Sequence, residues 1–218
     1  MTLNQYIDHT LLKPTANESD YLKLCSEALE YNFKAVCVPP TWVSFCKHIL
    51  KNSDVLVATV IGFPLGYSLT SSKVNEVQNL IDLNVDEIDF VINISWVKSD
   101  KFDFVFEEFK ALREASNGIV LKAILETGAL TEPEIKKLCD LALKAKLDFV
   151  KTSTGFYETG ARLSDVQLMK KQVGQLMQIK SSGGIKDYQT AKQFIDAGAD
   201  RIGCSASVAI LKESNEYI

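Results

Sequence analysis

Histidine and cysteine are scarce in this sequence, and their spacing argues against the common metal and disulfide frameworks. The two histidines, His9 and His48, do not form a HExxH-type pair, so a histidine-based metal centre is not expected. The five cysteines are odd in number, scattered and without CxxC spacing, which argues against a disulfide framework and a zinc site. We therefore predict no metal, and we expect most of the cysteines to be buried as small apolar side chains.

Long apolar runs, basic leader segments and linkers are also missing. The amino terminus, MTLNQYIDHT, has no basic segment and no apolar run of signal-peptide length, and no stretch approaches the ~20 apolar residues of a membrane-spanning helix. These absences predict a cytosolic protein without membrane contact. No Gly/Ser/Pro-rich tract, charge block or low-complexity segment interrupts the chain, so residues 1–218 are predicted to form a single domain.

The composition is that of a folded protein with a small net charge. Apolar residues make up 46% of the 218 residues and charged residues 24%, which is enough to build a sizeable core. The formal net charge of -4 gives no overall attraction to nucleic acid or to anionic membranes. Any anion that binds must therefore be held by a local site.

Short β-like runs alternate with amphipathic helical windows along the whole chain, with a spacing of roughly 25 to 35 residues. Eight such runs are present, at 6–12, 34–39, 55–63, 87–93, 119–126, 148–153, 175–182 and 200–205. Eight strands, seven or eight helices and no linker predict an α/β protein with a closed (β/α)₈ TIM barrel; an open doubly wound sheet usually has fewer strands. Thr131 with Glu134, and Ser164 with Gln167, have capping-box spacing and predict two helix starts.

Charged side chains gather near the predicted carboxyl ends of these strands, where the active sites of such barrels form. Lys151 and Lys180 lie near the ends of two neighbouring runs, and Asp89 lies in a third. Alternate residues of a strand share a face, so inward-facing positions would bring these charges together at one mouth. The alternative for each lysine alone is a place on the outer rim, with its stem packed and its ammonium in water.

Two lysines at one mouth offer a route to covalent catalysis. A lysine amine has an ordinary pKa of ~10.4, so it is protonated at neutral pH and is not nucleophilic. A second ammonium nearby and removal from water both lower that pKa. The free amine can then attack a carbonyl to form a Schiff base, and an aspartate at the same mouth can shuttle protons, directly or through a water.

Two loops of small residues follow the seventh and eighth runs and predict a phosphate site. Gly183 and Gly184 allow positive φ and let backbone amides approach an anion, and helices beginning near Asp187 or Ser205 would direct their amino ends to the same place. Lys186 adds a positive charge. A glycine pair alone usually marks only a turn, but the second loop favours the phosphate site.

Seven segments, in order from Asp8 to about Ser205, resemble the deoxyribose-phosphate aldolase family. They are IDHTLLKP, AVCVPP, VIGFPLG, DEIDFVINI, LKAILETGAL, FVKTSTGF and KSSGGI. The resemblance implies a class I aldolase on a (β/α)₈ barrel that uses no metal or other cofactor. It also implies reversible cleavage of 2-deoxy-D-ribose 5-phosphate to D-glyceraldehyde 3-phosphate and acetaldehyde.

The resemblance further implies roles for individual residues. Lys151 matches the Schiff-base nucleophile, Lys180 the adjacent cation that lowers its pKa and helps to move protons, and Asp89 the proton donor and acceptor that works with a water. The positions that line the family's pocket match Asp8, Thr10, Cys37 and Lys122. The phosphate contacts match Gly155, Gly183, Gly184, Lys186, Gly203 and Ser205.

The chain departs from the family pattern at several positions. Tyr157 and Glu158 stand in a segment that is often glycine-rich, and an acid close to a phosphate would be unfavourable unless it points outward. Ala206 follows Ser205 where many relatives have a second serine, which removes one hydroxyl. Tyr217 is placed like the carboxy-terminal tyrosine of some relatives, and the poor match of this tail assigns it no role.

Three other functions are compatible with the same residues. They are a Schiff-base aldolase for a related sugar phosphate, a pyridoxal-phosphate barrel, and a non-catalytic sugar-phosphate-binding barrel. A substrate panel, the presence of a yellow chromophore and a turnover assay separate these from the first function. The expected ligands are a sugar phosphate and acetaldehyde, with no nucleic acid, and the outer helix faces are apolar enough to allow a homodimer.

Overall fold

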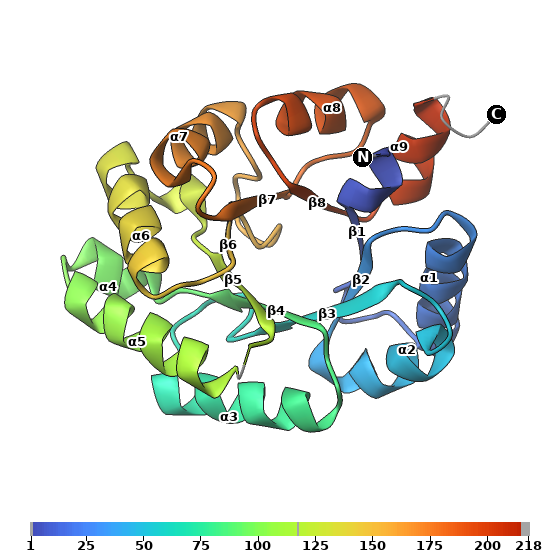
Figure 1. The fold of residues 1–218 in the computed structure, drawn as a ribbon, viewed down its shortest axis with the longest axis horizontal. Coiled ribbons are helices and arrows are strands. Elements are labelled where there is room, and N and C mark those ends of the chain that lie inside the picture. Colours follow the sequence, from blue (N-terminus) through green and yellow to red (C-terminus); the bar gives the residue numbers. More distant parts are fainter. Residues whose placement is uncertain (1, 117, 215–218) are drawn as a thin grey trace.

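The computed structural model describes residues 2–116 and 118–214, and it shows a closed barrel of eight parallel strands inside a ring of helices (Figure 1). The strands are β1 (Ile7–Thr10), β2 (Ala35–Val38), β3 (Leu56–Ile61), β4 (Glu87–Val91), β5 (Val120–Ile124), β6 (Phe149–Lys151), β7 (Gln178–Ser182) and β8 (Arg201–Cys204). Consecutive strands pair with each other, and β8 closes the barrel against β1, where Asp8 lies opposite Gly203. Each strand lies within one of the eight predicted runs, so the predicted (β/α)₈ barrel is confirmed.

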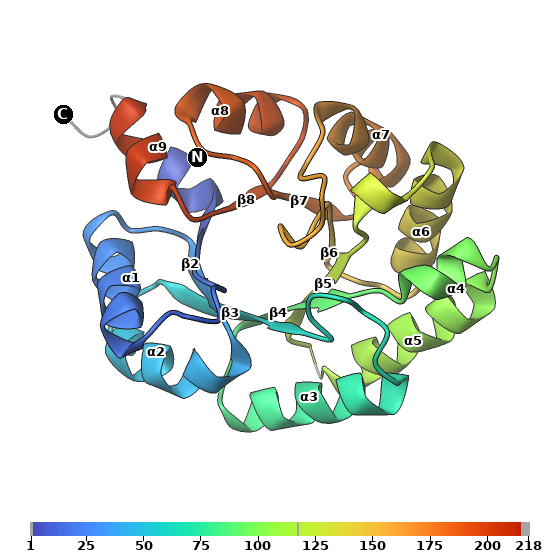
Figure 2. The same ribbon diagram turned by 180° about the vertical axis from the view of Figure 1, so that it is seen from behind.

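The helices surround the barrel, as Figures 1 and 2 show from its two ends. They are α1 (Glu18–Glu30), α2 (Val43–Leu50), α3 (Thr70–Asp82), α4 (Ile94–Lys98), α5 (Phe102–Ala115), α6 (Glu132–Lys144), α7 (Leu163–Val173), α8 (Tyr188–Asp196) and α9 (Ser207–Glu213). The short α4 in the connection from β4 to α5 was not expected, because five residues are too few to show a helical repeat. Short 3₁₀ turns occupy Leu3–Tyr6, Pro40–Trp42 and Thr127–Ala129.

Two helix starts test the capping-box spacing. Thr131 precedes α6, and its backbone N–H donates to the Glu134 carboxylate at 2.6 Å, so this prediction is confirmed. The second prediction is wrong, because Ser164 is the second residue of α7 and does not precede it. Arg162 precedes α7 instead, and its Nε donates to Asp165 at 2.9 Å. At the start of α7, the ion pair between Arg162 and Asp165 therefore stands where the spacing suggested a cap by the Ser164 hydroxyl.

Strand side chains alternate between the helix layer and the barrel interior. On β4, Ile88 and Phe90 are fully buried in the apolar core beneath the helices. Burial of each such side chain contributes about 1.5–3 kcal/mol to folding. Glu87 and Asp89 alternate with them and so face inward. A small separate apolar cluster lies on the inward faces of β2 and β3, formed by Cys37, Ala58 and Val60.

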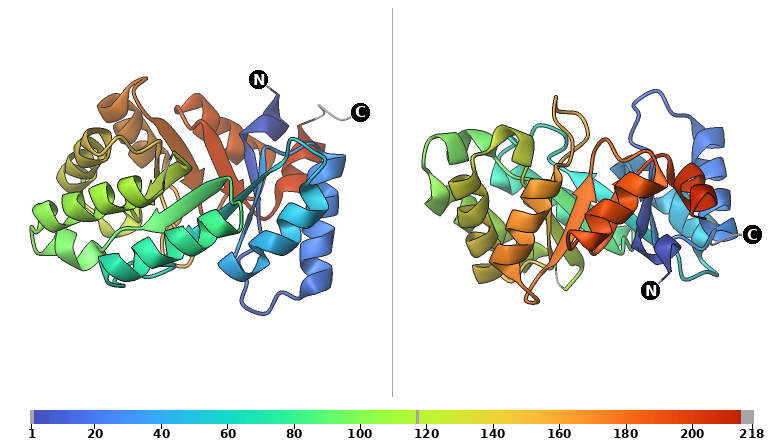
Figure 3. Two further views of the ribbon diagram at one scale, coloured as in Figure 1. Left: turned by 60° about the horizontal axis from the view of Figure 1, so that its bottom comes forward. Right: turned by 90° about the horizontal axis from the view of Figure 1, so that it is seen from above.

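The loops that follow the strands gather at one end of the barrel. In the right-hand view of Figure 3, the loops from β1 to α1 and from β6 to α7 project from the same side. In a parallel barrel this is the end at which ligands bind. Within the described ranges, no helix is both long and apolar enough to cross a membrane.

Candidate active site

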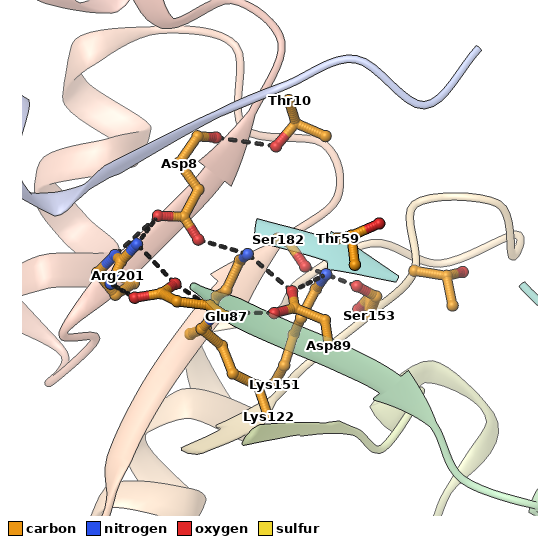
Figure 4. Close-up of polar contacts among 12 residues, drawn as sticks. Asp8, Thr10, Thr59, Glu87, Asp89, Lys122, Lys151, Ser153, Ser182 and Arg201 are labelled. Carbon is orange, nitrogen blue, oxygen red and sulfur yellow. Dashed lines mark hydrogen bonds and ion pairs between the residues drawn. The ribbon is translucent and has the colours of Figure 1, made fainter. Parts of the chain in front are cut away.

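A buried network of charged side chains lies inside the barrel (Figure 4). Its seven members come from six strands, and each is at most 5% exposed. The acids are Asp8, Glu87 and Asp89, and the bases are Lys122, Lys151, Lys180 and Arg201. Such groups are buried only when they are paired, so the barrel closes around a set of mutual ion pairs.

Asp89 is the centre of this network. Its Oδ1 accepts a hydrogen bond from Lys122 Nζ at 2.7 Å, and its Oδ2 accepts one from Lys151 Nζ and one from Lys180 Nζ, each at 2.8 Å. Because Lys151 and Lys180 share one oxygen atom, their amines are neighbours. The predicted convergence of these three residues is confirmed, and a position of either lysine on the outer rim is excluded.

A second part of the network lies deeper; it joins Asp8, which was predicted as a site residue, to Glu87 and Arg201, which were not. Arg201 holds both Asp8 and Glu87: its Nε donates to Asp8 at 2.7 Å and its Nη1 donates to Glu87 at 3.0 Å. The two parts are joined by Lys180, whose Nζ lies 2.5 Å from Asp8, and by Lys122, whose Nζ lies 2.6 Å from Glu87. The sequence held one sign that Glu87 belongs to the site. Glu87 lies two residues before Asp89 on the same strand, so the two side chains share a face.

The charges of the network show which amine gives up its proton most readily. Three carboxylates face four basic groups, so one basic group has no counter-charge. Burial disfavours charge on Lys180, but the ion pairs with Asp8 and Asp89 outweigh burial and raise its pKa. The pKa of Lys151 alone among the lysines of the network is lowered, because burial and the Lys180 ammonium outweigh the attraction of Asp89. Lys151 is therefore the amine most ready to act as a nucleophile.

The carboxylates of the network are strongly acidic. Burial opposes ionisation of Asp8, but Arg201 and Lys180 outweigh burial and lower its pKa to about 2. The pKa of Asp89 is held well below its ordinary value, because Lys122, Lys151 and Lys180 together overcome its burial. Both groups are ionised at neutral pH.

The low pKa of Asp8 predicts a loss of stability in acid. A carboxylate whose pKa is lower in the folded state stabilises the fold fully above its unfolded pKa, and this contribution is lost as the pH falls toward the folded value. For Asp8 the pKa falls from 3.8 to about 2 on folding. This shift corresponds to about 2 kcal/mol of unfolding free energy, lost between about pH 5 and pH 2. Urea unfolding at a series of pH values measures the change.

Two variants provide the comparison for this prediction. Asp8→Asn should flatten the dependence of the unfolding free energy on pH across that window, because the titrating group is gone. Asp54 is exposed and outside the network, so Asp54→Asn should keep the wild-type slope. An Asp8→Asn slope equal to that of the wild type would contradict the assignment.

A cavity of about 270 Å³ opens above the network at the carboxyl ends of the strands. Lys151 forms part of its wall, together with Thr10 and with two residues that were not predicted, Lys13 and Phe156. All six residues predicted to contact phosphate also line it, namely Gly155, Gly183, Gly184, Lys186, Gly203 and Ser205. The cavity therefore places the Lys151 amine and the two glycine loops around one space.

Several backbone amides at this cavity have no partner among the residues that the structure describes. Gly155, Gly183 and Gly184 have φ values of 81°, 91° and 83°, a region that glycine enters without a steric penalty. Within residues 2–116 and 118–214, the N–H groups of these glycines and of Ser205 donate to no protein acceptor. As predicted, α8 begins next to Asp187. Free amides at positive φ form the kind of concavity that binds anions.

The other predicted residues lie outside the cavity wall. Asp8, Cys37 and Lys122 were predicted to line the pocket, but all three are 0% exposed and lie below it. Burial raises the pKa of the Cys37 thiol, which keeps it protonated. Asp89 and Lys180 also lie outside the wall, and Asp89 touches it through Lys151, because its Oδ2 accepts from both Lys151 Nζ and Lys180 Nζ.

The departures from the family pattern lie away from the cavity. Tyr157 is 50% exposed and Glu158 is also exposed, and neither lines the cavity, so this acid does not oppose an anion there. Ala206 precedes α9 and lies outside the wall. Tyr217 lies outside the residues that the structure describes.

Fold and site together define a (β/α)₈-barrel enzyme in which one buried amine opens onto a glycine-lined cavity. Comparison with known proteins gives the family. The profile of the DeoC/LacD family aldolases matches residues 2–213. The chain therefore belongs to this family of aldolases, and the resemblance found in the sequence is confirmed.

Individual relatives agree with this assignment. The deoxyribose-phosphate aldolase of Mycoplasma capricolum subsp. capricolum is 49% identical over 215 residues, which cover 98% of this chain and 97% of the relative. The solved structure of QR15, an aldolase, is 41% identical with a TM-score of 0.93 and covers 98% of this chain and 96% of its own. The tetrameric deoxyribose phosphate aldolase from Aeropyrum pernix is 31% identical with a TM-score of 0.90, covering 99% and 92%.

Proposed function

We propose that this aldolase is a class I enzyme that reversibly cleaves 2-deoxy-D-ribose 5-phosphate to D-glyceraldehyde 3-phosphate and acetaldehyde. The observation that carries the proposal is the buried Lys151, whose pKa is lowered and which lines a cavity with amides that have no acceptor in the described part of the chain. A relative that is 49% identical over 98% of the chain is named for this activity.

In the proposed reaction Lys151 is the nucleophile. Its free Nζ adds to the C1 carbonyl of the open-chain sugar, and the addition product takes up one proton, relayed by Asp89 through a water, and loses water to give a protonated imine. Asp89 lies 2.8 Å from this nitrogen in the free enzyme, so it stabilises the positive charge that forms there. No metal ion takes part in this route.

The protonated imine then draws electrons from the C2–C3 bond. When the C3 hydroxyl gives its proton to Asp89 through a water, this bond breaks, its electron pair forms the enamine of acetaldehyde, and D-glyceraldehyde 3-phosphate leaves. The imine adds a fourth positive charge to three carboxylates, and the neutral enamine removes it. Cleavage thus removes the positive charge from the imine nitrogen beside Lys180, and the interior is neutral again once the relay releases the proton to solvent.

Proton transfers are assigned to Asp89 and Lys180, working through a water. Three amines surround Asp89 and hold its pKa well below its ordinary value, so Asp89 can keep a proton only briefly. Lys180 remains charged, because its ion pairs raise its pKa. Asp89 therefore acts as a relay, and protonation of the enamine followed by hydrolysis of the second imine frees Lys151.

The phosphate group is assigned to the rim of the cavity. The unpaired amides of Gly155, Gly183, Gly184 and Ser205 would donate to its oxygens, and Lys186 would supply a positive charge. Asp8, Thr10, Cys37 and Lys122 support the site from below or beside the cavity. A phosphate at the rim leaves the other end of the open-chain sugar near Lys151.

A coupled assay of D-glyceraldehyde 3-phosphate release tests this function directly. The enzyme should cleave 2-deoxy-D-ribose 5-phosphate in preference to D-ribose 5-phosphate, and borohydride with acetaldehyde should leave an ethyl group on Lys151. Preference for the 2-hydroxyl sugar would favour an aldolase for a related sugar phosphate. Absence of both turnover and adduct would favour a barrel that only binds sugar phosphates.

Assembly into a homodimer is a further part of the proposal. On α1, Leu22 and Leu29 are 50% and 43% exposed and lie on the outer surface. The relative from Aeropyrum pernix is described as tetrameric. Light scattering of the purified protein should give the mass of two chains. A mass of one or four chains would contradict the homodimer.

A further inference from the structure

A buried acid behind the loop from β6 to α7 is not used by the proposed reaction. Glu126 follows β5, is 2% exposed, and has a φ of 57°, which is rare for a residue other than glycine. Burial raises the pKa of its carboxyl group, while hydrogen bonds from Thr154 oppose this. A buried acid in an unfavourable backbone conformation at an active-site strand end calls for a specific contact.

That contact is made to one turn of the cavity wall. Glu126 Oε2 accepts a hydrogen bond from the Thr154 hydroxyl at 2.5 Å and another from the Thr154 backbone N–H at 3.2 Å. The Thr154 hydroxyl oxygen in turn accepts a bond from the backbone N–H of Phe156 at 3.0 Å. The amides on either side of Gly155 are thereby satisfied.

The middle amide is left for a ligand. Gly155 has a φ of 81°, and its N–H has no protein acceptor within the described parts of the chain. Both Thr154 and Gly155 line the cavity. With the flanking amides directed toward Glu126 and the Thr154 hydroxyl, the turn has one N–H free beside Gly183, whose Cα is the nearest atom to a Cβ built on Gly155.

We propose that Glu126 is a positioning residue, which acts through Thr154 to hold the Gly155 amide in the phosphate-binding part of the cavity. This inference deepens the proposed function and rests on it for the identity of the anion. Glu126 does not line the cavity, so its effect on a ligand is indirect. The Glu126 carboxylate is suited to the role, because it accepts hydrogen bonds from both the hydroxyl and the backbone N–H of Thr154.

The backbone around Glu126 is held by bonds that do not involve its side chain. Thr127 donates its N–H to Thr152 O at 2.9 Å, and Arg162 Nη2 donates to Thr127 O at 3.1 Å. Glycine also adopts positive φ more readily than glutamate. Glu126→Gly therefore deletes the carboxylate and leaves the backbone path unstrained.

The test measures kcat/KM for 2-deoxy-D-ribose 5-phosphate and for unphosphorylated 2-deoxy-D-ribose. We expect Glu126→Gly to lower the value for the phosphorylated sugar by about 10- to 100-fold and the value for the unphosphorylated sugar by less than about threefold. Glu126→Gln keeps one acceptor oxygen and should fall between Glu126→Gly and the wild type. Glu158→Gln makes the same change on an exposed acid of the loop and should behave like the wild type.

Inorganic phosphate binding, followed by calorimetry, gives a readout that needs no turnover. Affinity should fall in Glu126→Gly while the melting temperature and borohydride trapping of acetaldehyde on Lys151 are retained. An equal loss for both sugars, or unchanged phosphate affinity, would overturn the positioning role. Failure of the wild type in turnover and trapping would overturn the proposed function instead, and the phosphate arm would still decide the role of Glu126.

A double-mutant cycle shows whether the effect passes through Thr154. Thr154→Val removes the hydroxyl, and Thr154→Ser keeps it and should retain phosphate affinity. Because the acid and the hydroxyl act as one unit, Glu126→Gly combined with Thr154→Val should cost no more affinity than the larger single change. Fully additive losses would show that the two residues act independently and would overturn the proposal.

Discussion

Lys151→Met is expected to lower turnover of 2-deoxy-D-ribose 5-phosphate by at least about 10⁴-fold, while the protein stays folded. Methionine has a similar length but no amine, so no imine can form. The other six members of the network are three acids and three bases, so removal of Lys151 leaves no charge unbalanced. Asp89 loses one of three hydrogen-bond donors and keeps those from Lys122 and Lys180.

The coupled assay for D-glyceraldehyde 3-phosphate measures this loss. Mass spectrometry after treatment with acetaldehyde and borohydride should find the ethyl adduct in the wild type and none in Lys151→Met. Lys171→Met makes the same change at an exposed position of α7 and should retain both turnover and adduct. Turnover within about tenfold of the wild type in folded Lys151→Met would show that this amine is not the nucleophile.

Lys180→Met is expected to move activity to higher pH and to lower kcat/KM near pH 7 by about 100-fold. Without Lys180, three acids face only two bases besides Lys151, so Lys151 becomes the counter-charge and keeps its proton. The like charge that lowers the pKa of Lys151 is also gone. An amine nucleophile is active only when deprotonated, so the raised pKa of Lys151 lowers the fraction of reactive amine at pH 7.

A pH–rate profile of Lys180→Met and of the wild type tests whether activity moves to higher pH. Activity of the variant should rise toward the wild-type level as the pH passes the raised pKa of Lys151. Loss of one partner from a buried ion pair costs about 3–5 kcal/mol, so both profiles are recorded at a temperature where circular dichroism shows folded protein. A profile that keeps the wild-type midpoint and is lowered equally at every pH would refute this role of Lys180.

The strand order and the main lysine cluster could be predicted because they depend on short-range pattern. A strand exposes alternate residues on one face, and parallel strands end at one rim, so the spacing of Lys151, Lys180 and Asp89 was enough to predict their convergence. Capping-box spacing was a weaker guide: it located α6, but at α7 the Arg162–Asp165 ion pair decided the start.

The depth of each side chain inside the barrel could not be predicted. The alternation along a strand shows which face a side chain is on, but it does not show how far along the barrel axis the side chain lies. Cys37 matches a pocket position, yet it packs below the cavity in the small apolar cluster. Arg201 begins its strand and would be assigned to the bottom rim, but its long side chain reaches Asp8 and Glu87 in the interior. Glu126 carried no signal, since its role depends on a loop 28 residues away.

By itself the sequence determined that eight βα units form one barrel and that the reactive groups lie at strand ends. The repeat of apolar residues and the order of the elements depend only on residues close together in the chain. Only the tertiary structure decided which amine has the lowered pKa. A buried group keeps or loses its proton according to the sum of all charges around it, and here those charges come from six strands. That sum exists only when the barrel is closed.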